Sequence, residues 1–315
     1  MKLVVQVPCH NEAEQLPTTL GSLPRALSGF SSVEWLVVDD GSTDGTAEVA
    51  RASGAAHIVR LPENRGLGHA FAVGIEAALR AGADVVVNTD GDNQYCGDDI
   101  AKLVEPILRN EAQVVVGARP IREIAHFSPA KRVLQRLGSA VVRSLSGVDV
   151  QDATSGFRAY SREAALTLNV FSRYTYSLET LIQAGRRRLV VRSVPVRINP
   201  PTRGSRLSRG TSHYIWRAML SMMHAYAIYR PLRFFAAPAA ILGAAGALLG
   251  LRFLWYFAST GGSAGHVQSL ILAAILIVLA GLLGAVGIIA ELIAINRRLL
   301  EDIQSSERRR EWGNA

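Results

Sequence analysis

Apolar and polar positions follow two rhythms along the first part of the chain. Short apolar runs occupy residues 3–7, 35–38, 57–61, 84–88 and 113–116, and stretches with helical spacing lie between them at 12–27, 68–81 and 98–109. Strands that alternate with helices in this way are typical of βαβ units, in which parallel strands form one sheet that helices cover. The pattern therefore predicts an α/β domain with a mostly parallel sheet.

Two later stretches differ in character, because residues 234–251 and 267–290 contain no Asp, Glu, Lys or Arg. A helix that crosses a bilayer needs about 20 apolar residues. The first stretch reaches that length if it continues to residue 258, with Arg252 extending towards the interface, and the second continues to residue 295. We expect two transmembrane helices joined by a hairpin; the alternative is a pair of buried helices in a soluble core.

The charges around these stretches predict their orientation. The connection at 259–266 contains no Lys or Arg, whereas the outer ends of the two stretches are flanked by Arg230, Arg233, Arg297 and Arg298. By the positive-inside rule both termini face the cytosol. The N-terminal apolar run is closed by Pro8 and does not resemble a cleavable signal peptide. We therefore expect an integral membrane protein whose folded domain is cytosolic.

These patterns divide the chain into four parts. We expect a cytosolic α/β domain at 1–209, a juxtamembrane helix at 210–233, a transmembrane hairpin at 234–296 and a cytosolic tail at 297–315. The juxtamembrane part mixes apolar residues with Arg and His, which favours an amphipathic interfacial helix; the alternative is a helix packed on the soluble domain. Gly-rich stretches in both spans are consistent with self-association as a homo-oligomer.

The net charge of +8 is concentrated, because eleven Arg and no Lys, Asp or Glu lie between residues 180 and 233. Basic clusters beside a membrane attract anionic headgroups, whereas a nucleic-acid-binding domain would carry basic and aromatic residues on its soluble part. We therefore expect a membrane partner and no nucleic acid. The two cysteines, Cys9 and Cys96, are too few for a disulfide framework or a four-cysteine zinc site.

Polar residues follow the predicted strands at the positions where α/β sheets bind ligands. The run at 84–88 leads into Asp90-Gly91-Asp92-Asn93-Gln94. Two carboxylates one residue apart present hard oxygen ligands that suit Mg²⁺ or Mn²⁺, although an acidic turn can also be merely solvated. No Gly-x-Gly-x-x-Gly follows the first run and no Gly-Lys-Ser/Thr is present, which argues against a dinucleotide-binding or P-loop domain.

Five ordered motifs together resemble family 2 glycosyltransferases with the GT-A fold. They are Pro8-Cys9-His10-Asn11-Glu12, Asp39-Asp40-Gly41-Ser42-Thr43-Asp44-Gly45-Thr46, Asn64-x-Gly66-x-Gly68, Asp90-Gly91-Asp92-Asn93-Gln94 and Gly156-Phe157-Arg158. With the two apolar stretches, the chain is similar to the polyprenyl-phosphate sugar synthases, the branch of dolichol-phosphate mannose synthase and bacterial undecaprenyl-phosphate glycosyltransferases. The resemblance implies inverting transfer of one hexose-type sugar from a UDP- or GDP-sugar to undecaprenyl or dolichyl phosphate, with Mg²⁺ or Mn²⁺.

The resemblance also implies roles for individual residues. Donor binding would involve Pro8, His10, Asn11, Glu12, Asp39, Asp40, Asn64, Gly66, Gly68, Asp90, Gly91 and Asp92. The metal would be held by Asp90, Asp92 and Gln94. The acceptor phosphate and the diphosphate would be bound by Arg119, Arg132, Arg136, Arg203, Arg206 and Arg209, each of which could instead attract headgroups. The candidate catalytic residues are Asp92, Asp152, Arg119 and Arg132.

A phosphate acceptor changes what the site needs. The second pKa of a phosphate monoester is about 6, so its oxygen is largely ionised at neutral pH and needs no general base. Cationic side chains must position it instead. Asp152 would then hold a sugar hydroxyl or an Arg; the alternatives are a helix cap or a salt bridge with Arg158. Two other functions stay open, transfer to a glycan or polysaccharide and a catalytically silent membrane scaffold.

Overall fold

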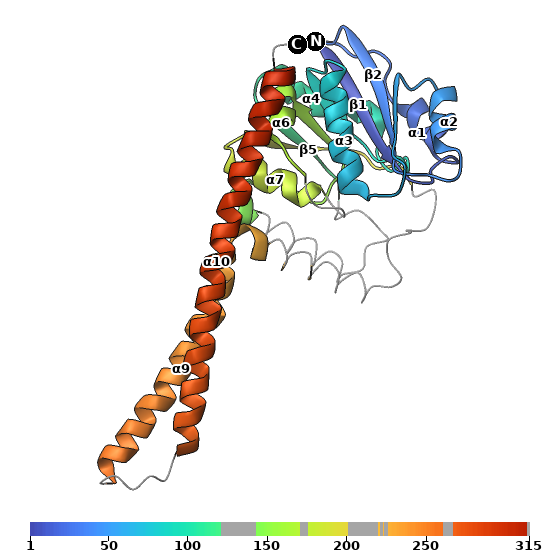
Figure 1. Ribbon diagram of the computed structural model, residues 1–315. Coiled ribbons are helices and arrows are strands. Elements are labelled where there is room, and N and C mark those ends of the chain that lie inside the picture. The colour runs from blue at the N-terminus through green and yellow to red at the C-terminus, as the bar shows by residue number, and fades with distance from the viewer. Residues whose placement is uncertain are drawn as a thin grey trace. The chain divides into compact units, whose positions relative to one another are not determined.

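A computed structural model describes residues 1–120, 143–170, 176–200, 220, 223, 226–260 and 267–313. The chain divides into two compact units, Met1–Ala218 with Asp302–Ala315, and Met219–Glu301. The first unit is an α/β domain, and the second contains two long helices, α9 and α10, of which α10 continues into the first unit (Figure 1).

The first unit contains a seven-stranded sheet in the order β3-β2-β1-β4-β6-β5-β7. Its strands are β1 (Lys2–Cys9), β2 (Ser32–Asp39), β3 (His57–Arg60), β4 (Val85–Asn88), β5 (Val114–Ala118), β6 (Arg158–Ser161) and β7 (Val191–Pro195). All neighbouring strands are parallel except at β6, which runs antiparallel to both β4 and β5. The predicted mostly parallel sheet is thus confirmed, and β6 and β7 are added to the five predicted strands.

Helices cover both faces of this sheet (Figure 1). One face packs against α1 (Leu16–Ser22), α2 (Thr46–Ala52) and α4 (Ile100–Leu108), and the other against α3 (Leu67–Arg80), α6 (Arg162–Thr167) and α7 (Ser177–Arg186). Successive side chains of a strand point to opposite faces, so Leu3 and Val5 enter the first of these cores while Val4 enters the second. The central strands are buried on both faces, which explains their continuous apolar runs.

Helix α1 is shorter than the predicted helix at 12–27, since it spans only Leu16–Ser22. Leu23 has an extended backbone, with φ −81° and ψ 142°. Pro24 follows it, and a proline disfavours helical geometry in the residue that precedes it. The helix therefore ends where the proline requires it to end.

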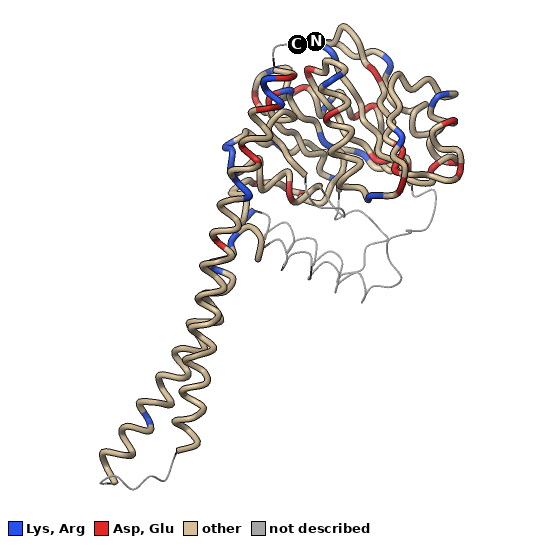
Figure 2. Tube along the Cα trace, in the orientation of Figure 1, with Lys and Arg blue, Asp and Glu red and all other residues tan. Residues whose placement is uncertain are grey.

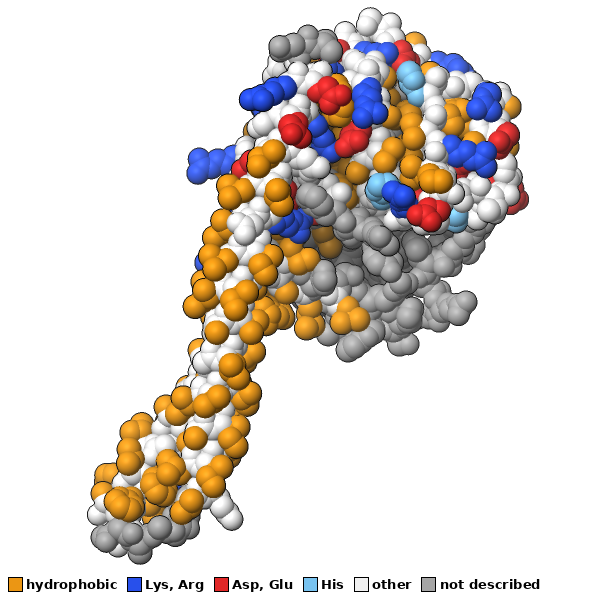
Figure 3. Space-filling view, viewed as in Figure 1, with side chains coloured by type: hydrophobic (Ala, Val, Ile, Leu, Met, Phe, Trp, Pro, Cys, Tyr) orange, Lys and Arg blue, Asp and Glu red, His pale blue; other side chains and the backbone are white. Residues whose placement is uncertain are grey.

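The second unit contains α9 (Pro231–Ser259) and most of α10 (Val267–Trp312), both long and apolar enough to cross a membrane. Long stretches of both helices lack charged residues (Figure 2), and hydrophobic side chains cover the visible face of the pair (Figure 3). In the most apolar stretch of each helix, only 6% and 11% of the residues are buried. Core helices of a soluble fold would be mostly buried, so this exposure argues against that alternative. Gly246 permits close packing of the pair, because a Cβ there would lie 3.0 Å from the carbonyl oxygen of Ala273.

Helix α10 does not end at the expected boundary of the hairpin but continues as one helix to Trp312. Its last residues belong to the first unit, where Trp312 is buried in the core that contains α3 and α6. Arg308 donates to the Leu168 carbonyl at 2.8 Å and forms an ion pair with Glu76 at 2.6 Å. From Asp302 onward, the predicted tail therefore belongs to the α/β unit and packs on its core. The predicted amphipathic segment at 210–233 falls largely outside the described residues.

We predict that Arg308→Ala destabilises the α/β domain. The substitution leaves the Leu168 carbonyl without its side-chain donor and Glu76 without its cation, and an unsatisfied buried acceptor costs about 1–3 kcal/mol. Unfolding of the detergent-solubilised full chain measures the loss. Arg309→Ala is the control, since it removes the same charge from an exposed position of the same helix, where substitutions change stability by about 0.5 kcal/mol or less. Equal losses in the two variants would contradict the described packing.

Candidate active site

The candidate site lies at the carboxyl ends of β1, β2 and β4. From β1 the chain proceeds to β2 and β3 on one side of the sheet and then returns to β4 on the other side. Ligands of open α/β sheets bind outside the carboxyl ends of the strands at such a switch point. The polar motifs predicted from the sequence follow these three strands, so the topology brings them to one edge.

Asp40, in the turn after β2, binds the backbone of the loop that leads into α3. Its two carboxylate oxygens accept the backbone N–H groups of Arg65 and Gly66, each at 2.8 Å. Gly41 follows with φ +65°, and a Cβ there would lie 2.4 Å from the carbonyl carbon of Glu63. Only glycine fits so close an approach at this backbone angle. Asp40 and Gly41 thus fix the loop that carries the predicted donor residues Asn64 and Gly66.

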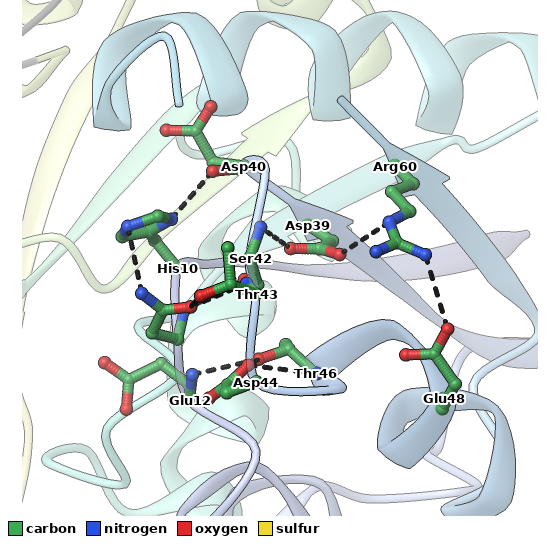
Figure 4. A network of polar contacts seen from close by, with 11 residues as sticks. His10, Glu12, Asp39, Asp40, Ser42, Thr43, Asp44, Thr46, Glu48 and Arg60 are labelled. Carbon is green, nitrogen blue, oxygen red and sulfur yellow. Dashed lines mark hydrogen bonds and ion pairs between the residues drawn. The ribbon is translucent and has the colours of Figure 1, made fainter. Parts of the chain in front are cut away.

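Asp39 is the second buried carboxylate of this turn and has different partners (Figure 4). Its Oδ1 accepts the Ser42 N–H at 2.9 Å, and its Oδ2 lies 3.6 Å from Nε of Arg60. Arg60 also forms an ion pair with Glu48 at 3.3 Å. Asp39 therefore retains oxygen lone pairs that its backbone contact does not use, whereas both oxygens of Asp40 are occupied.

The segment after β1 is pinned to the same turn (Figure 4). Nδ1 of His10 lies 2.8 Å from the Asp40 carbonyl oxygen, and its Nε2 lies 3.3 Å from the amide nitrogen of Asn11. A carbonyl only accepts and an amide NH₂ only donates, so the neutral tautomer with its proton on Nδ1 satisfies both contacts. The N–H of Glu12 donates to the Thr46 hydroxyl at 3.0 Å. These contacts hold the first two predicted motifs together as one surface.

Asp90 and Asp92 follow β4 at the centre of this edge. Burial, followed by the negative charge of Asp92, raises the pKa of Asp90 to about 7, against the opposing charges of Arg119 and Arg158. None of the described residues donates a hydrogen bond to the Asp90 carboxylate. Oδ1 of Asp92 accepts the Gln94 N–H at 3.1 Å, so the side chain helps to form its own turn. Two repelling carboxylates with free lone pairs suit a divalent cation.

Few of the described protein side chains are available at this position as ligands for a metal ion. In the part of the chain that the structure describes, no three His, Cys, Asp or Glu side chains gather as a metal-binding group. A cation held by Asp90 and Asp92 would therefore complete its coordination with oxygens from other sources, and Mg²⁺ commonly uses one or two carboxylates together with substrate phosphates. The residues fit such an ion without further protein ligands.

Arg119 and Asp152 form a buried ion pair at the same edge. Nε of Arg119 donates to Asp152 Oδ2 at 2.7 Å, and its terminal nitrogen donates to Asp152 Oδ1 at 3.2 Å and to the Thr154 hydroxyl at 2.9 Å. Burial alone would raise the pKa of Asp152, but the hydrogen bonds and charge of Arg119 hold that pKa below its ordinary value. The bidentate geometry fixes the guanidinium plane. Of the alternatives for Asp152, the structure shows an arginine held in place.

Arg158, the other arginine considered as a partner of Asp152, has a different role. It is fully buried and donates to the carbonyl oxygens of Ala153, Ser155 and Ser177 at 2.7–2.8 Å. It also donates to the Thr180 hydroxyl at 2.9 Å. A buried charge is tolerated when it is hydrogen-bonded in this way. Arg158 therefore ties the loop before β6 to helix α7.

Three further residues predicted to bind the donor lie close to these motifs, whereas five predicted arginines lie outside the described residues. Pro8 lies within β1, Gly68 lies in the first turn of α3, and Gly91 packs against Cys9, whose Sγ would be 2.7 Å from a Cβ at residue 91. The predicted arginines that lie outside the described residues are Arg132, Arg136, Arg203, Arg206 and Arg209. The structure thus brings together the predicted residues after β1, β2 and β4, with Arg119 and Asp152 beside them.

Sequence reasoning missed a layer of polar side chains beneath Asp90. Gln6 donates to Asn88 at 2.8 Å across the register of β1 and β4, and Asn88 donates to the Tyr176 hydroxyl at 2.7 Å. The Tyr95 hydroxyl accepts the Gly156 N–H at 3.1 Å. The sequence carried one signal for this layer, because each of two apolar runs contains an amide side chain, Gln6 and Asn88. Buried polar groups need hydrogen-bond partners, and these two residues are paired in the register of β1 and β4.

The sequence matches a known protein family and several characterised proteins. Residues 4–168 match the family described as Glycosyl transferase family 2. The undecaprenyl-phosphate mannosyltransferase of Micrococcus luteus is 30% identical over 176 residues, covering 54% of this chain and 70% of that protein. The dolichol-phosphate mannosyltransferase of Pyrococcus furiosus is 29% identical over 273 residues, covering 83% of this chain and 74% of that protein.

Solved structures give a similar result. Glucosyl-3-phosphoglycerate synthase from Mycobacterium tuberculosis, crystallised with phosphoglyceric acid, superposes with a TM-score of 0.55 and 25% identity, covering 70% of this chain and 79% of that one. A further structure of that synthase, with Mn²⁺, UDP-glucose and phosphoglyceric acid, has a TM-score of 0.53, 24% identity and the same coverage. These matches confirm the predicted α/β architecture of the GT-A type.

We predict that Asp152 makes stability depend on pH in the acid range. Its pKa is lowered in the folded state, so its contribution is fully present above the unfolded value of about 4 and is lost as pH falls through the folded value. Asp152→Asn should therefore destabilise the chain at pH 7 by about 1–3 kcal/mol, and the difference from wild type should shrink at pH 3.

Unfolding of the detergent-solubilised chain at both pH values provides the measurement. Asp149→Asn is the control, because Asp149 lies on the same loop with 91% of its side chain exposed and a longer contact of 3.5 Å to Arg143. It should change neither stability nor its pH dependence. A difference between wild type and Asp152→Asn that stays constant from pH 7 to pH 3 would contradict the assigned pair.

Proposed function

The chain belongs to glycosyl transferase family 2, and from this premise we propose that it transfers one hexose-type sugar from a nucleotide diphosphate sugar to a polyprenyl phosphate at the cytosolic face of a membrane. The observation that carries the proposal is the Asp90 and Asp92 pair beside the fixed guanidinium of Arg119, at the switch point of the sheet. A metal site next to a cation suits a reaction between two phosphorylated substrates.

Several relatives support a lipid-phosphate acceptor. The similar proteins from Micrococcus luteus and Pyrococcus furiosus are named for mannosyl transfer to undecaprenyl phosphate and dolichol phosphate. The two exposed apolar helices of this chain suit an enzyme whose acceptor is embedded in the bilayer. We infer UDP- or GDP-sugar as the donor, because the turn after β2 offers Asp39, a buried carboxylate with spare lone pairs, at the edge where a nucleotide would bind.

The metal is proposed as Mg²⁺ or Mn²⁺. Asp90 and Asp92 would hold it, with Gln94 near the turn that Asp92 forms. When bound, such an ion neutralises the charge that develops on the departing diphosphate. Crystal structures of the fold neighbour glucosyl-3-phosphoglycerate synthase contain Mn²⁺ with UDP-glucose, which supports a divalent cation in this fold generally.

The acceptor half of the reaction needs orientation more than proton transfer. A lipid monophosphate is already largely ionised at neutral pH, so Arg119 would hold it in line with the anomeric carbon while Asp152 fixes the plane of that guanidinium. Both oxygens of Asp152 are engaged by Arg119 and Thr154, which suits a positioning residue better than a general base. Direct displacement at an α-linked donor inverts the sugar and gives a β-linked product.

The membrane arrangement is proposed from charge. Arg residues flank the outer ends of α9 and the apolar part of α10, and the connection between the helices carries none. We therefore place the α/β domain and both termini in the cytosol. The packing of the last turns of α10 on the α/β domain supports this proposal, because it is consistent with the end of this helix and the domain being on the same side of the membrane.

The direct test is transfer of radiolabel from a panel of UDP- and GDP-sugars to undecaprenyl or dolichyl phosphate in membranes that contain the protein, with Mn²⁺, Mg²⁺ or chelator. We expect chloroform-extractable label from one donor, and none with chelator. Folded, membrane-bound protein that labels no lipid phosphate from any donor would overturn the proposal. Label on a glycan instead would favour the polysaccharide acceptor, and no transfer at all would favour a silent scaffold.

We predict that Asp92→Ala lowers metal-dependent transfer by about 10²-fold or more, the usual cost of losing a group that stabilises developing charge. Asp98→Ala is the matched control in the same loop region, because its side chain is 81% exposed, and transfer should stay within about twofold of wild type. Initial rates at saturating donor and metal give the comparison. Full metal-dependent activity of Asp92→Ala would refute the metal assignment.

A further inference from the structure

A cluster of buried polar contacts converges on the backbone of one residue, Gly156. Its N–H donates to the Tyr95 hydroxyl at 3.1 Å. Its carbonyl oxygen accepts two hydrogen bonds, from the Tyr176 hydroxyl at 3.1 Å and from the amide of Asn88 at 2.8 Å. Both polar groups of this glycine are therefore held from opposite directions by side chains that come from separate parts of the chain.

Gly156 lies directly against the carboxylate of Asp90. A Cβ on Gly156 would stand 2.9 Å from both carboxylate oxygens and 2.8 Å from the Tyr176 hydroxyl, distances too short for a side chain. The backbone of Gly156 is thus a wall beside the carboxylate. No described residue donates a hydrogen bond to the Asp90 oxygens, so packing against this wall helps to limit the directions in which the carboxylate can point.

The groups that hold the wall are themselves rigid. The Tyr176 ring stacks on Phe71 with centroids 4.0 Å apart and planes 1° from parallel, and the Tyr95 ring stacks on Phe157 at 4.9 Å. Both tyrosines are almost fully buried. The Asn88 amide nitrogen uses its two hydrogens on Gly156 and Tyr176, and its oxygen accepts from Gln6 at 2.8 Å. Little freedom remains for Gly156 to move.

We propose that Tyr176 and Tyr95 are positioning residues that aim the carboxylate of Asp90 at a divalent cation through the backbone of Gly156. This rests on the proposed function, because it assumes that Asp90 and Asp92 bind the metal. Groups that orient a metal ligand from behind typically change metal affinity by about 10–100-fold when they are removed. The hydrogen bonds of both tyrosines end on the backbone of Gly156, so we assign their effect on the carboxylate to the position of that backbone.

The test uses the full chain in detergent and measures Mn²⁺ binding from the electron paramagnetic resonance signal of free Mn²⁺, with UDP or GDP present to supply diphosphate oxygens. Tyr176→Phe keeps the stacked ring and removes only the hydroxyl, and we expect about tenfold weaker Mn²⁺ binding. The half-saturating Mn²⁺ concentration for sugar transfer should rise by the same factor, while the rate at saturating Mn²⁺ recovers most of the wild-type value.

Tyr160→Phe is the matched control. Tyr160 is fully buried on the same face of the sheet and meets the same Phe71 ring edge-on at 5.8 Å. The substitution therefore removes a buried hydroxyl that is not hydrogen-bonded to Gly156. We expect its Mn²⁺ affinity to stay within twofold of wild type. Tyr95→Phe serves as the second variant, since it removes the acceptor of the Gly156 N–H and should weaken Mn²⁺ binding as Tyr176→Phe does.

The outcomes separate this inference from the proposed function. Unchanged Mn²⁺ affinity in folded Tyr176→Phe and Tyr95→Phe would overturn the positioning role, as would equal weakening in Tyr160→Phe or a wild-type protein that binds no Mn²⁺ with either nucleotide. Wild-type protein that binds Mn²⁺ in this Tyr176-dependent way but transfers no sugar to lipid phosphate would uphold the positioning role and refute the proposed acceptor.

Discussion

The repulsion between Asp90 and Asp92, at the end of a strand buried on both faces, is the constraint around which the site is organised. Burial raises the pKa of Asp90 to about 7, and Asp92 adds to that effect. The nearby cations do not neutralise the pair directly, because Arg119 is held by Asp152 and Arg158 by backbone carbonyls. The lone pairs of the two carboxylates thus remain available for a ligand, and a divalent cation with a diphosphate is the ligand that suits them.

Elsewhere at this edge of the sheet, some polar side chains use their hydrogen bonds to hold the structure, whereas others keep lone pairs for a ligand. Of the two carboxylates after β2, Asp40 is occupied by backbone N–H groups while Asp39 keeps spare lone pairs. Asp152 likewise uses its oxygens to orient Arg119. Preorganised groups of this kind cost no rearrangement when charge develops in a reaction, which is the physical reason for placing so many buried polar contacts around a small number of free ones.

Much of this site could be predicted from the sequence, because each motif directly follows an apolar run and parallel strands end at one edge. The contacts beneath Asp90 could not be predicted, because Tyr176 and Asn88 are 88 residues apart in the sequence and no local pattern links them. Strand β6 was not predicted for another reason: it begins with Arg158, which is fully buried although it is charged, so the strand does not form an apolar run. The packing of α10 was equally hidden: Ser305, Arg308 and Trp312 share a buried face, yet two of the three are polar, so hydrophobic periodicity cannot reveal it.

The central claim is that the carboxyl edge of β1, β2 and β4 binds a divalent cation between Asp90 and Asp92 together with a nucleotide. Anomalous X-ray diffraction at the manganese edge, from crystals of the full chain grown with Mn²⁺ and UDP or GDP, tests it most directly. The account predicts one strong peak within coordination distance of the Asp92 carboxylate, about 2.0–2.3 Å, next to the diphosphate. Bound nucleotide with no manganese peak at these two carboxylates would contradict it.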